Sequence, residues 1–193
     1  MTPSILKTKR LILRPFQLAD APDLQRLIGD YDVSKTLLVV PYPYVDGEAE
    51  RFINSTLEET NRDTEMHWAI TLDKNLIGGS GLKMKPEEKT IMVGYWLGKD
   101  FWGKGYMTEA LREIINYAFQ STQAERVEAC HFASNPASGK VMQKAGMVFT
   151  EIRTQCYETM EGKQDGLHYS ISRSQWEDLR QNLIAIHITA SFY

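Results

Sequence analysis

A glycine-rich loop between an apolar strand and an amphipathic helix constrains this chain more than any other feature. Residues 91–97 favour a strand, the loop covers residues 98–105, and the spacing after it predicts a helix over about residues 106–120. The first amides of a helix have no intrahelical partners, the helix dipole makes that end positive, and glycine lets the backbone approach a ligand closely. The segment is therefore typical of a phosphate or pyrophosphate site.

Two better-known phosphate motifs do not match this loop. Gly98, Gly103 and Lys104 match part of the loop of phosphate-binding ATPases, but Gly105 stands where Ser or Thr would bind magnesium. The dinucleotide fingerprint requires a third glycine where this chain has Thr108. From this segment alone, glycines that only shape a turn remain an equal alternative.

The order of the other expected elements predicts an α+β, or mixed α/β, fold with a large central sheet. With 193 residues, the chain is expected to form a single domain over residues 1–183. Asp20 is expected to cap the first helix, and Ser174 with Glu177 forms a candidate capping box for the last. Strands are expected over residues 11–14, 67–72, 76–83, 126–131, 148–157 and 168–172, and further helices near Asp46 and Ser138.

The C-terminal segment, residues 184–193, is unusually apolar. It carries Ile184, Ile186, Ile188 and Phe192. This segment could form an extra strand, a packed arm or a subunit contact. A subunit contact would make the chain a homodimer.

The composition argues against several classes of protein. A formal net charge of −3 disfavours a general nucleic-acid binder. The two cysteines, Cys130 and Cys156, lack a CxxC partner and suit a reducing compartment. The four histidines show no metal-ligand spacing, so no metal is expected. The start of the chain lacks an apolar run and no stretch approaches the about 18 apolar residues of a membrane span, so we expect a cytoplasmic protein without a membrane partner.

A second motif, from Ala133 to Phe149, changes the interpretation of the first. Asn135 ends an expected strand, Ser138 lies in the first helical turn, and Gly146 ends the helix. Taken alone, Asn135 and Ser138 are ordinary helix caps. Together with the glycine-rich segment, the motif resembles the GNAT acetyltransferases, and most of all their ribosomal-protein N-acetyltransferase branch, the RimJ/RimL type.

The resemblance covers the chain up to about Trp176. It implies the GNAT fold, in which helices flank a central, mostly antiparallel sheet and acetyl-coenzyme A is held in a splay between two central strands. The stretches that carry it stand in the order expected for the family: residues 8–15 (TKRLILRP), 41–44 (PYPY), 76–82 (LIGGSGL), 94–97 (GYWL) and 102–110 (WGKGYMTEA), with Asp165 and Tyr169 in the last hairpin.

The resemblance also implies a coenzyme site. The family's loop pattern is Arg/Gln-x-x-Gly-x-Gly/Ala, of which residues 102–107 retain only the central glycine. Leu97 ends the strand along which the pantetheine arm would lie, and Asn135 would bind that arm. Lys140 and Lys144, with Lys104, either meet the coenzyme phosphates or are solvated surface charges. Backbone amides of the loop would hold the pyrophosphate, from Trp102, Gly103, Lys104, Gly105, Tyr106, Met107 and Thr108.

Acetyl transfer to an amine requires a donor to the thioester oxygen and a proton for the leaving thiolate. The resemblance gives the first role to the backbone amide near Leu97, and such donors contribute about 3 kcal/mol each. It gives the second role to Ser138. Many relatives use a tyrosine for this role, at a position where this chain has Met142.

The reaction also requires a neutral amine, and the usual base is missing. Relatives often place Glu where this chain has Met92; the nearby alternatives are His67, Tyr95, Glu87 and Glu88, although packing or simple exposure is favoured for His67. An α-amine, with a pKa near ~7.7–8.0, is partly neutral at pH ~7.4, whereas a lysine side chain near ~10.4 costs about 4 kcal/mol to deprotonate. A site without a strong base therefore favours an α-amine, and we expect the N-terminus of a protein or peptide.

Two other functions remain open from the sequence. The acceptor could be a small amine such as a polyamine, an aminoglycoside or an amino acid. Trp68, Tyr42, Tyr44 and Trp96 would then line its pocket, unless they belong to the core. Alternatively, the chain could bind the coenzyme as a sensor without catalysis, and turnover distinguishes the two.

Overall fold

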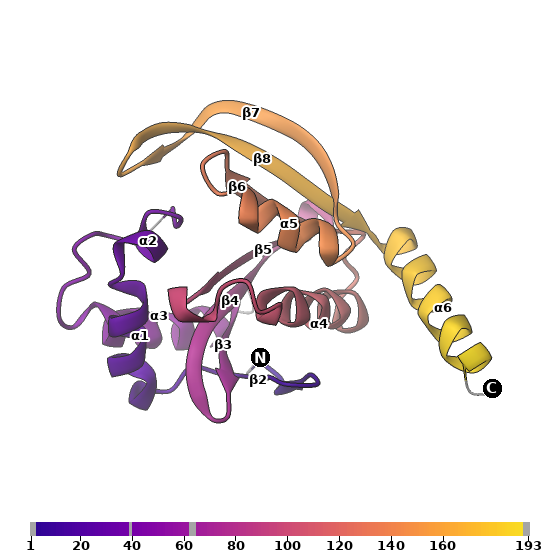
Figure 1. The fold of residues 1–193 in the computed structure, drawn as a ribbon, viewed down its shortest axis with the longest axis horizontal. Coiled ribbons are helices and arrows are strands. Elements are labelled where there is room, and N and C mark those ends of the chain that lie inside the picture. Colours follow the sequence, from indigo (N-terminus) through magenta and orange to yellow (C-terminus); the bar gives the residue numbers. More distant parts are fainter. Residues whose placement is uncertain (1–2, 39, 62–64, 191–193) are drawn as a thin grey trace.

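The computed structural model describes residues 3–38, 40–61 and 65–190, with one eight-stranded sheet at the centre (Figure 1). The strand order is β1-β2-β3-β4-β5-β6-β8-β7. Every neighbouring pair is antiparallel except β5 and β6, so the predicted mixed, mostly antiparallel sheet is confirmed. The strands are β1 (Leu6–Lys7), β2 (Ile12–Arg14), β3 (Glu65–Leu72), β4 (Asn75–Lys85), β5 (Thr90–Leu97), β6 (Arg126–Phe132), β7 (Val148–Thr159) and β8 (Gly162–Ser172).

The two parallel strands separate halfway along their length. Their ladder ends with Met92 opposite Glu128, although β5 continues to Leu97 and β6 to Phe132. The predicted splay between two central strands is therefore present. It lies beside the start of the glycine-rich loop, because that loop follows directly on β5.

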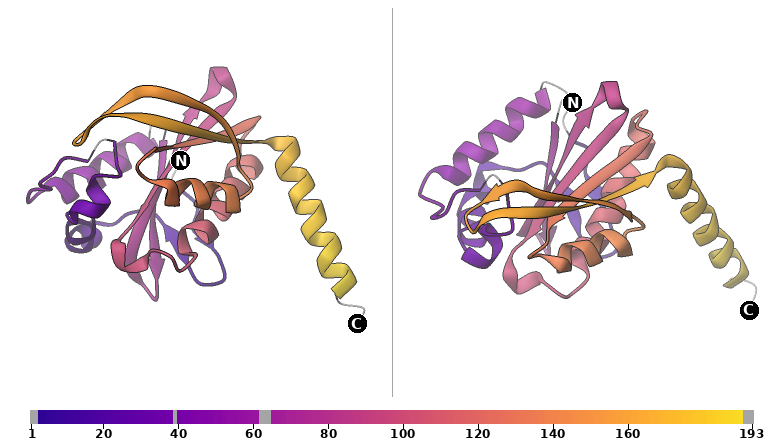
Figure 2. Two further views of the ribbon diagram at one scale, coloured as in Figure 1. Left: turned by 45° about the horizontal axis from the view of Figure 1, so that its top comes forward. Right: turned by 90° about the horizontal axis from the view of Figure 1, so that it is seen from above.

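Helices cover both faces of the sheet (Figures 1 and 2). Side chains alternate across a strand, so Trp68 of β3 packs into the larger apolar core with α4 and α5, and Ala69 into the smaller one with α1 and α3. The helices are α1 (Ala21–Ile28), α2 (Tyr31–Ser34), α3 (Glu48–Asn61), α4 (Tyr106–Ser121), α5 (Pro136–Lys144) and α6 (Arg173–Ala190).

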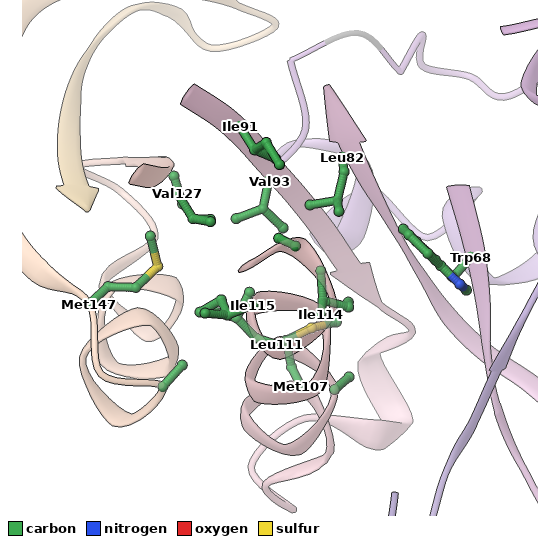
Figure 3. Close-up of a cluster of buried hydrophobic side chains, with 14 of the residues drawn as sticks. Trp68, Leu82, Ile91, Val93, Met107, Leu111, Ile114, Ile115, Val127 and Met147 are labelled. Carbon is green, nitrogen blue, oxygen red and sulfur yellow. The ribbon is translucent and has the colours of Figure 1, made fainter. Parts of the chain in front are cut away.

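The larger core fixes the position of α4 (Figure 3). Apolar residues recur at every third or fourth position of α4, so only one face of the helix can pack on the sheet. Burying a side chain of leucine size contributes about 1.5–3 kcal/mol, which holds the helix and its N-terminus in place. The buried residues in this contact are Met107, Leu111, Ile114 and Ile115 of α4 and Leu82, Ile91, Val93 and Val127 of the strands.

The predicted cap of α1 is wrong. Asp20 occupies the N-cap position, but its side chain makes no capping bond to that helix. Its carboxylate instead accepts two hydrogen bonds from Arg14, at 2.8 and 2.7 Å, and one from the Gln17 amide at 2.8 Å. The carboxylate is buried, so an arginine is a stronger partner for it than a helix end.

The predicted capping box of α6 is also wrong in its position. Ser172 and Gln175 form it: the Gln175 amide donates to Ser172 Oγ at 3.2 Å, and the Ser172 amide donates to Gln175 Oε1 at 2.9 Å. The box stands two residues before Ser174 because α6 begins at Arg173, directly after β8.

The described part of the apolar tail is helical and does not form an extra strand. Residues 184–190 continue α6, which crosses the predicted boundary at residue 183 and leads away from the rest of the molecule (Figures 1 and 2). Near its start, Trp176 is buried and donates to Asn116 of α4 at 2.7 Å. Phe192 lies outside the described residues, and a subunit contact stays a prediction. None of the helices in the described part of the chain is long and apolar enough to cross a membrane.

Candidate active site

A cavity of about 420 Å³ opens where β5 and β6 separate. Its walls come from the ends of these strands, the loop after β5, the first turns of α4 and α5, and the segment after α2. Tyr95 packs with the core of α4, whereas Gly94 and Cys130 alternate with core residues and so belong to the opposite face. The splay thus gives a cavity lined from both faces of the sheet.

The cavity brings together the predicted coenzyme residues, with Lys104 as the exception. The Lys104 ammonium lies over the Phe101 ring instead, 6.0 Å from its centroid. Lys140 and Lys144 line the wall and place positive charge beside the glycine-rich loop. The other predicted residues in the wall are Leu97, Trp102, Gly103, Gly105, Tyr106, Met107, Thr108, Asn135 and Ser138.

Two glycines determine the path of the loop. Gly103 and Gly105 have φ angles of +72° and +78°, in the left-handed region that other residues enter only at a cost. Gly105 precedes the first residue of α4, so the turn exposes the first amides of that helix at the cavity wall. These amides and the positive end of the helix dipole favour an anion there.

Trp102 ties the loop to the strand. Its indole N–H donates to the carbonyl of Leu97 at 2.8 Å. The bond joins the last residue of β5 to the turn before α4, on the side where β5 has lost its parallel partner. The strand end and the helix end are thereby held in one arrangement and can contact the same ligand.

Asn135 is the N-cap of α5. Its Oδ1 accepts the Ser138 amide at 3.3 Å, so the ordinary capping role is present. The predicted contact with the pantetheine arm would use the amide nitrogen of the same side chain. Both can hold at once, because Asn carries an acceptor and two donors on different atoms.

Ser138 is paired with a tyrosine from β5. The hydroxyls of Tyr95 and Ser138 lie 2.8 Å apart, and the Tyr95 hydroxyl also lies 3.1 Å from the Ser138 carbonyl, so its single proton has two acceptors within hydrogen-bond distance. Burial raises the pKa of Tyr95 well above its usual value, against a smaller lowering by the Ser138 bond. The tyrosine therefore keeps its proton and can share it with Ser138. Tyr95 is one of the four candidate bases in the sequence, but its surroundings suit an acid.

His131 is a cavity residue that the sequence did not single out. Its Nδ1 lies 2.8 Å from the Phe132 carbonyl, which only accepts, so Nδ1 carries the proton. Among the described residues, its buried Nε2 has no partner. A methyl group on Gly139 would stand 2.5 Å from this Nε2, which explains a glycine inside α5. No motif marks His131, because its role depends on how α5 packs on β6.

Cys130 is unsuited to be a nucleophile. Burial raises the pKa of its thiol, and its sulfur lies 3.1 Å from the Tyr157 hydroxyl. A thiol is a much poorer nucleophile than a thiolate.

In the part of the chain that is described, no group of three or more His, Cys, Asp or Glu side chains could hold a metal ion.

The four aromatic residues suggested for an acceptor pocket separate in the structure. Trp96 lines the cavity. Trp68 is fully buried in the core, where it packs edge-on against Tyr117. Tyr42 is exposed and Tyr44 packs against the smaller core. Only Trp96 therefore meets the expectation of a pocket wall.

Comparisons with known proteins identify the family. A model of the acetyltransferase (GNAT) domain matches residues 10–148. The probable N-acetyltransferase YjcK of Bacillus subtilis (strain 168) is 32% identical over 150 residues, which covers 74% of this chain and 82% of that protein. The chain belongs to the GNAT family and is an acetyl-coenzyme A-dependent N-acetyltransferase.

Solved structures share the fold. RimL, described as a ribosomal L7/L12 alpha-N-protein acetyltransferase in complex with coenzyme A, superposes with a TM-score of 0.80 at 18% identity, covering 88% of this chain and 98% of that one. The microcin C7 self-immunity acetyltransferase MccE, in complex with acetyl-CoA and AMP, gives a TM-score of 0.80 at 21% identity, covering 89% and 97%. The predicted RimJ/RimL-type GNAT fold is thereby confirmed.

Proposed function

We propose that the chain acetylates the α-amine of a protein or peptide N-terminus, by direct attack within a ternary complex with acetyl-coenzyme A. The observation that carries this proposal is the cavity lined from both faces of the sheet, by Tyr95 and Ser138 on one side and by Gly94 and Cys130 on the other. A donor lying along α4 and an acceptor arriving from the opposite face would meet at the splay.

The residues along α4 and α5 suit the donor. The first amides of α4, with Lys140 and Lys144 nearby, would hold the pyrophosphate, and Asn135 would hold the pantetheine arm. When bound, acetyl-coenzyme A supplies the activated acetyl group. The backbone amide near Leu97 is assigned to the thioester oxygen, where a preorganised donor contributes about 3 kcal/mol.

The leaving thiolate would receive its proton from Ser138, and Tyr95 would replace that proton. Their hydroxyls are 2.8 Å apart, which is hydrogen-bond distance, and both line the cavity. Because burial raises the pKa of Tyr95, the pair stays protonated across the physiological range. The arrangement supplies an acid without the tyrosine that relatives carry at the position of Met142.

Two arguments support an α-amine as the acceptor. No carboxylate stands at position 92, so an amine that is partly neutral at pH ~7.4 is favoured over lysine. The second argument is analogy with RimL, whose description names an alpha-N-protein acetyltransferase and whose fold matches over 88% of this chain.

A small amine is the second candidate. MccE matches the fold as well as RimL does, and its structure contains AMP beside acetyl-CoA. A protein of this fold thus binds a small molecule in addition to the acetyl donor. An amino acid or a nucleotide-linked amine is the corresponding acceptor class here.

The release of free coenzyme A tests the proposal. We expect turnover with a peptide whose α-amine is free and whose lysine is acetylated, and none with the same peptide blocked at its α-amine and free at lysine. Amino acids and polyamines serve as the small-amine series. Turnover of lysine or of small amines alone would overturn the acceptor assignment; tight binding of acetyl-coenzyme A without any product would instead favour a sensor.

A further inference from the structure

Four apolar side chains line the cavity where it faces away from α4. They are Leu37 and Leu38 after α2, Trp96 of β5, and Phe132 at the end of β6. Trp96 and Phe132 stand two residues beyond Gly94 and Cys130, so they lie on the same face of the sheet. Helix α2 contacts α1, which covers that face. This part of the wall is the acceptor side of the cavity, on which an incoming amine would arrive.

Three of these side chains serve no other apolar contact of the fold. Leu37, Leu38 and Phe132 belong to neither of the two cores described above. Leu38 is 45% exposed, and Phe132 is buried with its ring 5.7 Å from that of Tyr157. Apolar surface that lines a cavity outside a core is available for an apolar part of a ligand to cover.

The formal charges of the cavity wall all lie on the donor side. Among the described residues that line the cavity, none is Asp, Glu or Arg, and the two lysines, Lys140 and Lys144, both belong to α5. The charges of α2 and its neighbours are paired with one another outside the wall, since Asp32 pairs with Lys35 at 2.7 Å and with Lys99 at 2.6 Å. A charged group that entered the acceptor side would therefore lose its hydration without gaining an ionic partner, which costs free energy.

The hydroxyl and the thiol on the acceptor side already have partners. Thr36 Oγ1 donates to the Val33 carbonyl at 2.7 Å. The Cys130 sulfur lies 3.1 Å from the Tyr157 hydroxyl. A polar side chain that entered here would have to compete with these hydrogen bonds, whereas an apolar one would leave them intact.

We propose that the acceptor side binds the side chain of the acceptor's first residue, and that the enzyme prefers peptides whose first residue is large, apolar and uncharged, such as leucine. The inference rests on the proposed function and names the class of peptide. The α-amine and the first side chain share one Cα atom. An amine that reaches the splay at Gly94 therefore places that side chain on the neighbouring wall, at Leu37, Leu38 and Phe132.

The same wall disfavours small charged amines. A polyamine carries a second ammonium, and a free amino acid carries a carboxylate on the same Cα atom as its amine. Neither group finds an oppositely charged partner among the described residues of the acceptor side. In a peptide, a neutral amide replaces this carboxylate, so the first residue brings only its side chain as a possible charge.

Three peptides that differ only in their first residue test the preference. They begin with leucine, alanine or aspartate, and kcat/KM is measured at saturating acetyl-coenzyme A by release of coenzyme A. The values are calculated for the neutral fraction of each α-amine, so that differences in basicity do not enter. We expect the leucine peptide to exceed the alanine peptide about 30-fold, because each methylene enclosed in an apolar pocket contributes about tenfold and less on a partly open wall. The aspartate peptide should fall about tenfold or more below the alanine peptide.

A charge placed in the wall should change the preference. Leu38→Lys should lower kcat/KM for the leucine peptide about tenfold and raise it for the aspartate peptide about fivefold. Leu57→Lys is the matched control, because Leu57 of α3 is also 45% exposed but does not line the cavity. It should change neither value more than about twofold. Calorimetry should give both variants the wild-type affinity for acetyl-coenzyme A, which shows that the fold and the donor side are intact.

The outcomes separate this inference from the proposed function. Equal use of the three peptides by the wild type would overturn the apolar preference and leave the α-amine assignment standing. An unchanged order of preference in Leu38→Lys, or the same change in Leu57→Lys, would also reject the binding of the first side chain at this wall. If no peptide is turned over at all, the proposed function fails and the preference fails with it.

Discussion

The two sides of the candidate active site are built from different parts of the chain. On the side of α4 and α5, the site is largely backbone, from one stretch between Leu97 and Thr108 and from the first turn of α5. On the opposite side, it consists of positions on separate strands, with Gly94 and Trp96 on β5 and Cys130 on β6.

This difference bears on what each side tolerates. A backbone site depends on chain path, so the loop can depart from the family's side-chain pattern and still present the amides of α4 to the cavity. A site made of side chains changes with one substitution, as at position 92, where this chain has Met and relatives often have Glu. We expect the donor side to fix the reaction and the acceptor side to fix which amine is used. The four predictions below test this division, in order of decreasing effect.

The largest effect is expected from the partly buried ion pair that supports the acceptor side. Arg14 and Asp20 are joined by two hydrogen bonds, and their side chains are 20% and 8% exposed. Arg14→Met leaves the carboxylate without its cation and should lower the free energy of unfolding by about 3 kcal/mol. Urea denaturation followed by tryptophan fluorescence measures the change.

The control removes both charges. Arg14→Met with Asp20→Asn should recover much of the lost stability, since no unpaired charge remains buried. The folded Arg14→Met protein should bind acetyl-coenzyme A normally, because the pair lies on the acceptor side. A double variant less stable than Arg14→Met would show that the loss does not come from the unpaired carboxylate.

The next effect concerns the acid on the donor side. Ser138→Ala and Tyr95→Phe should each lower kcat about 100-fold while acetyl-coenzyme A affinity is kept. Because the two hydroxyls act as one unit, the double variant should be little worse than either single one. Burial raises the pKa of Tyr95, so its proton is retained as pH rises, and wild-type kcat should show no alkaline fall below about pH 10.

Pre-steady-state measurement of coenzyme A release gives these rates. Independent losses that multiply in the double variant would contradict a shared proton path between Tyr95 and Ser138. An alkaline fall of kcat near pH ~8 would point to an acid other than this pair.

Two glycines allow the sides to be perturbed one at a time. Gly105→Ala forces a side chain into φ +78° and should weaken acetyl-coenzyme A binding about tenfold, because the first turn of α4 shifts. Gly94→Ala has open space and no positive φ, so coenzyme binding should stay within about twofold while the acceptor KM rises. Calorimetry and steady-state kinetics measure the two effects. Equal effects of both variants on coenzyme binding would contradict the division of the site into a donor side and an acceptor side.

The glycine-rich loop and the start of α4 could be predicted from the sequence because their signals are local. Glycines at positions 103 and 105, a strand before them and an apolar helical stripe after them all lie within one segment. Local geometry decides the path of the loop, because the φ angles of its glycines and the position of the helix N-terminus do not depend on distant residues. The exception is Lys104, whose side chain turns to Phe101, a choice that no pattern encodes.

The acceptor side could not be predicted, because its geometry depends on strand register. That Gly94 of β5 and Cys130 of β6 face the same cavity follows from the pairing of the strands and from the point where it ends. The contact of Tyr95 with Ser138 on the donor side depends in the same way on the packing of α5. Each strand was recognised separately, but a shift of one residue would turn every side chain to the other face. The same reason explains why Trp68 was a pocket candidate and proved to be core.

The smallest effect is expected at the outer edge of the acceptor side. The Tyr31 hydroxyl after α1 donates to Glu161 Oε1 at 3.1 Å, which links α2 to the turn between β7 and β8. Both groups are reached by solvent, so Tyr31→Phe should raise the acceptor KM only about twofold, without any change in coenzyme affinity. Glu161→Gln keeps an acceptor for the hydroxyl and serves as the matched variant, expected to behave as wild type.

Steady-state kinetics with a short and a long α-amine peptide shows whether the Tyr31–Glu161 bridge contacts the peptide. A loss of tenfold or more that grows with peptide length would extend the acceptor site to this bridge, and the boundary between the two sides would then lie further from the splay.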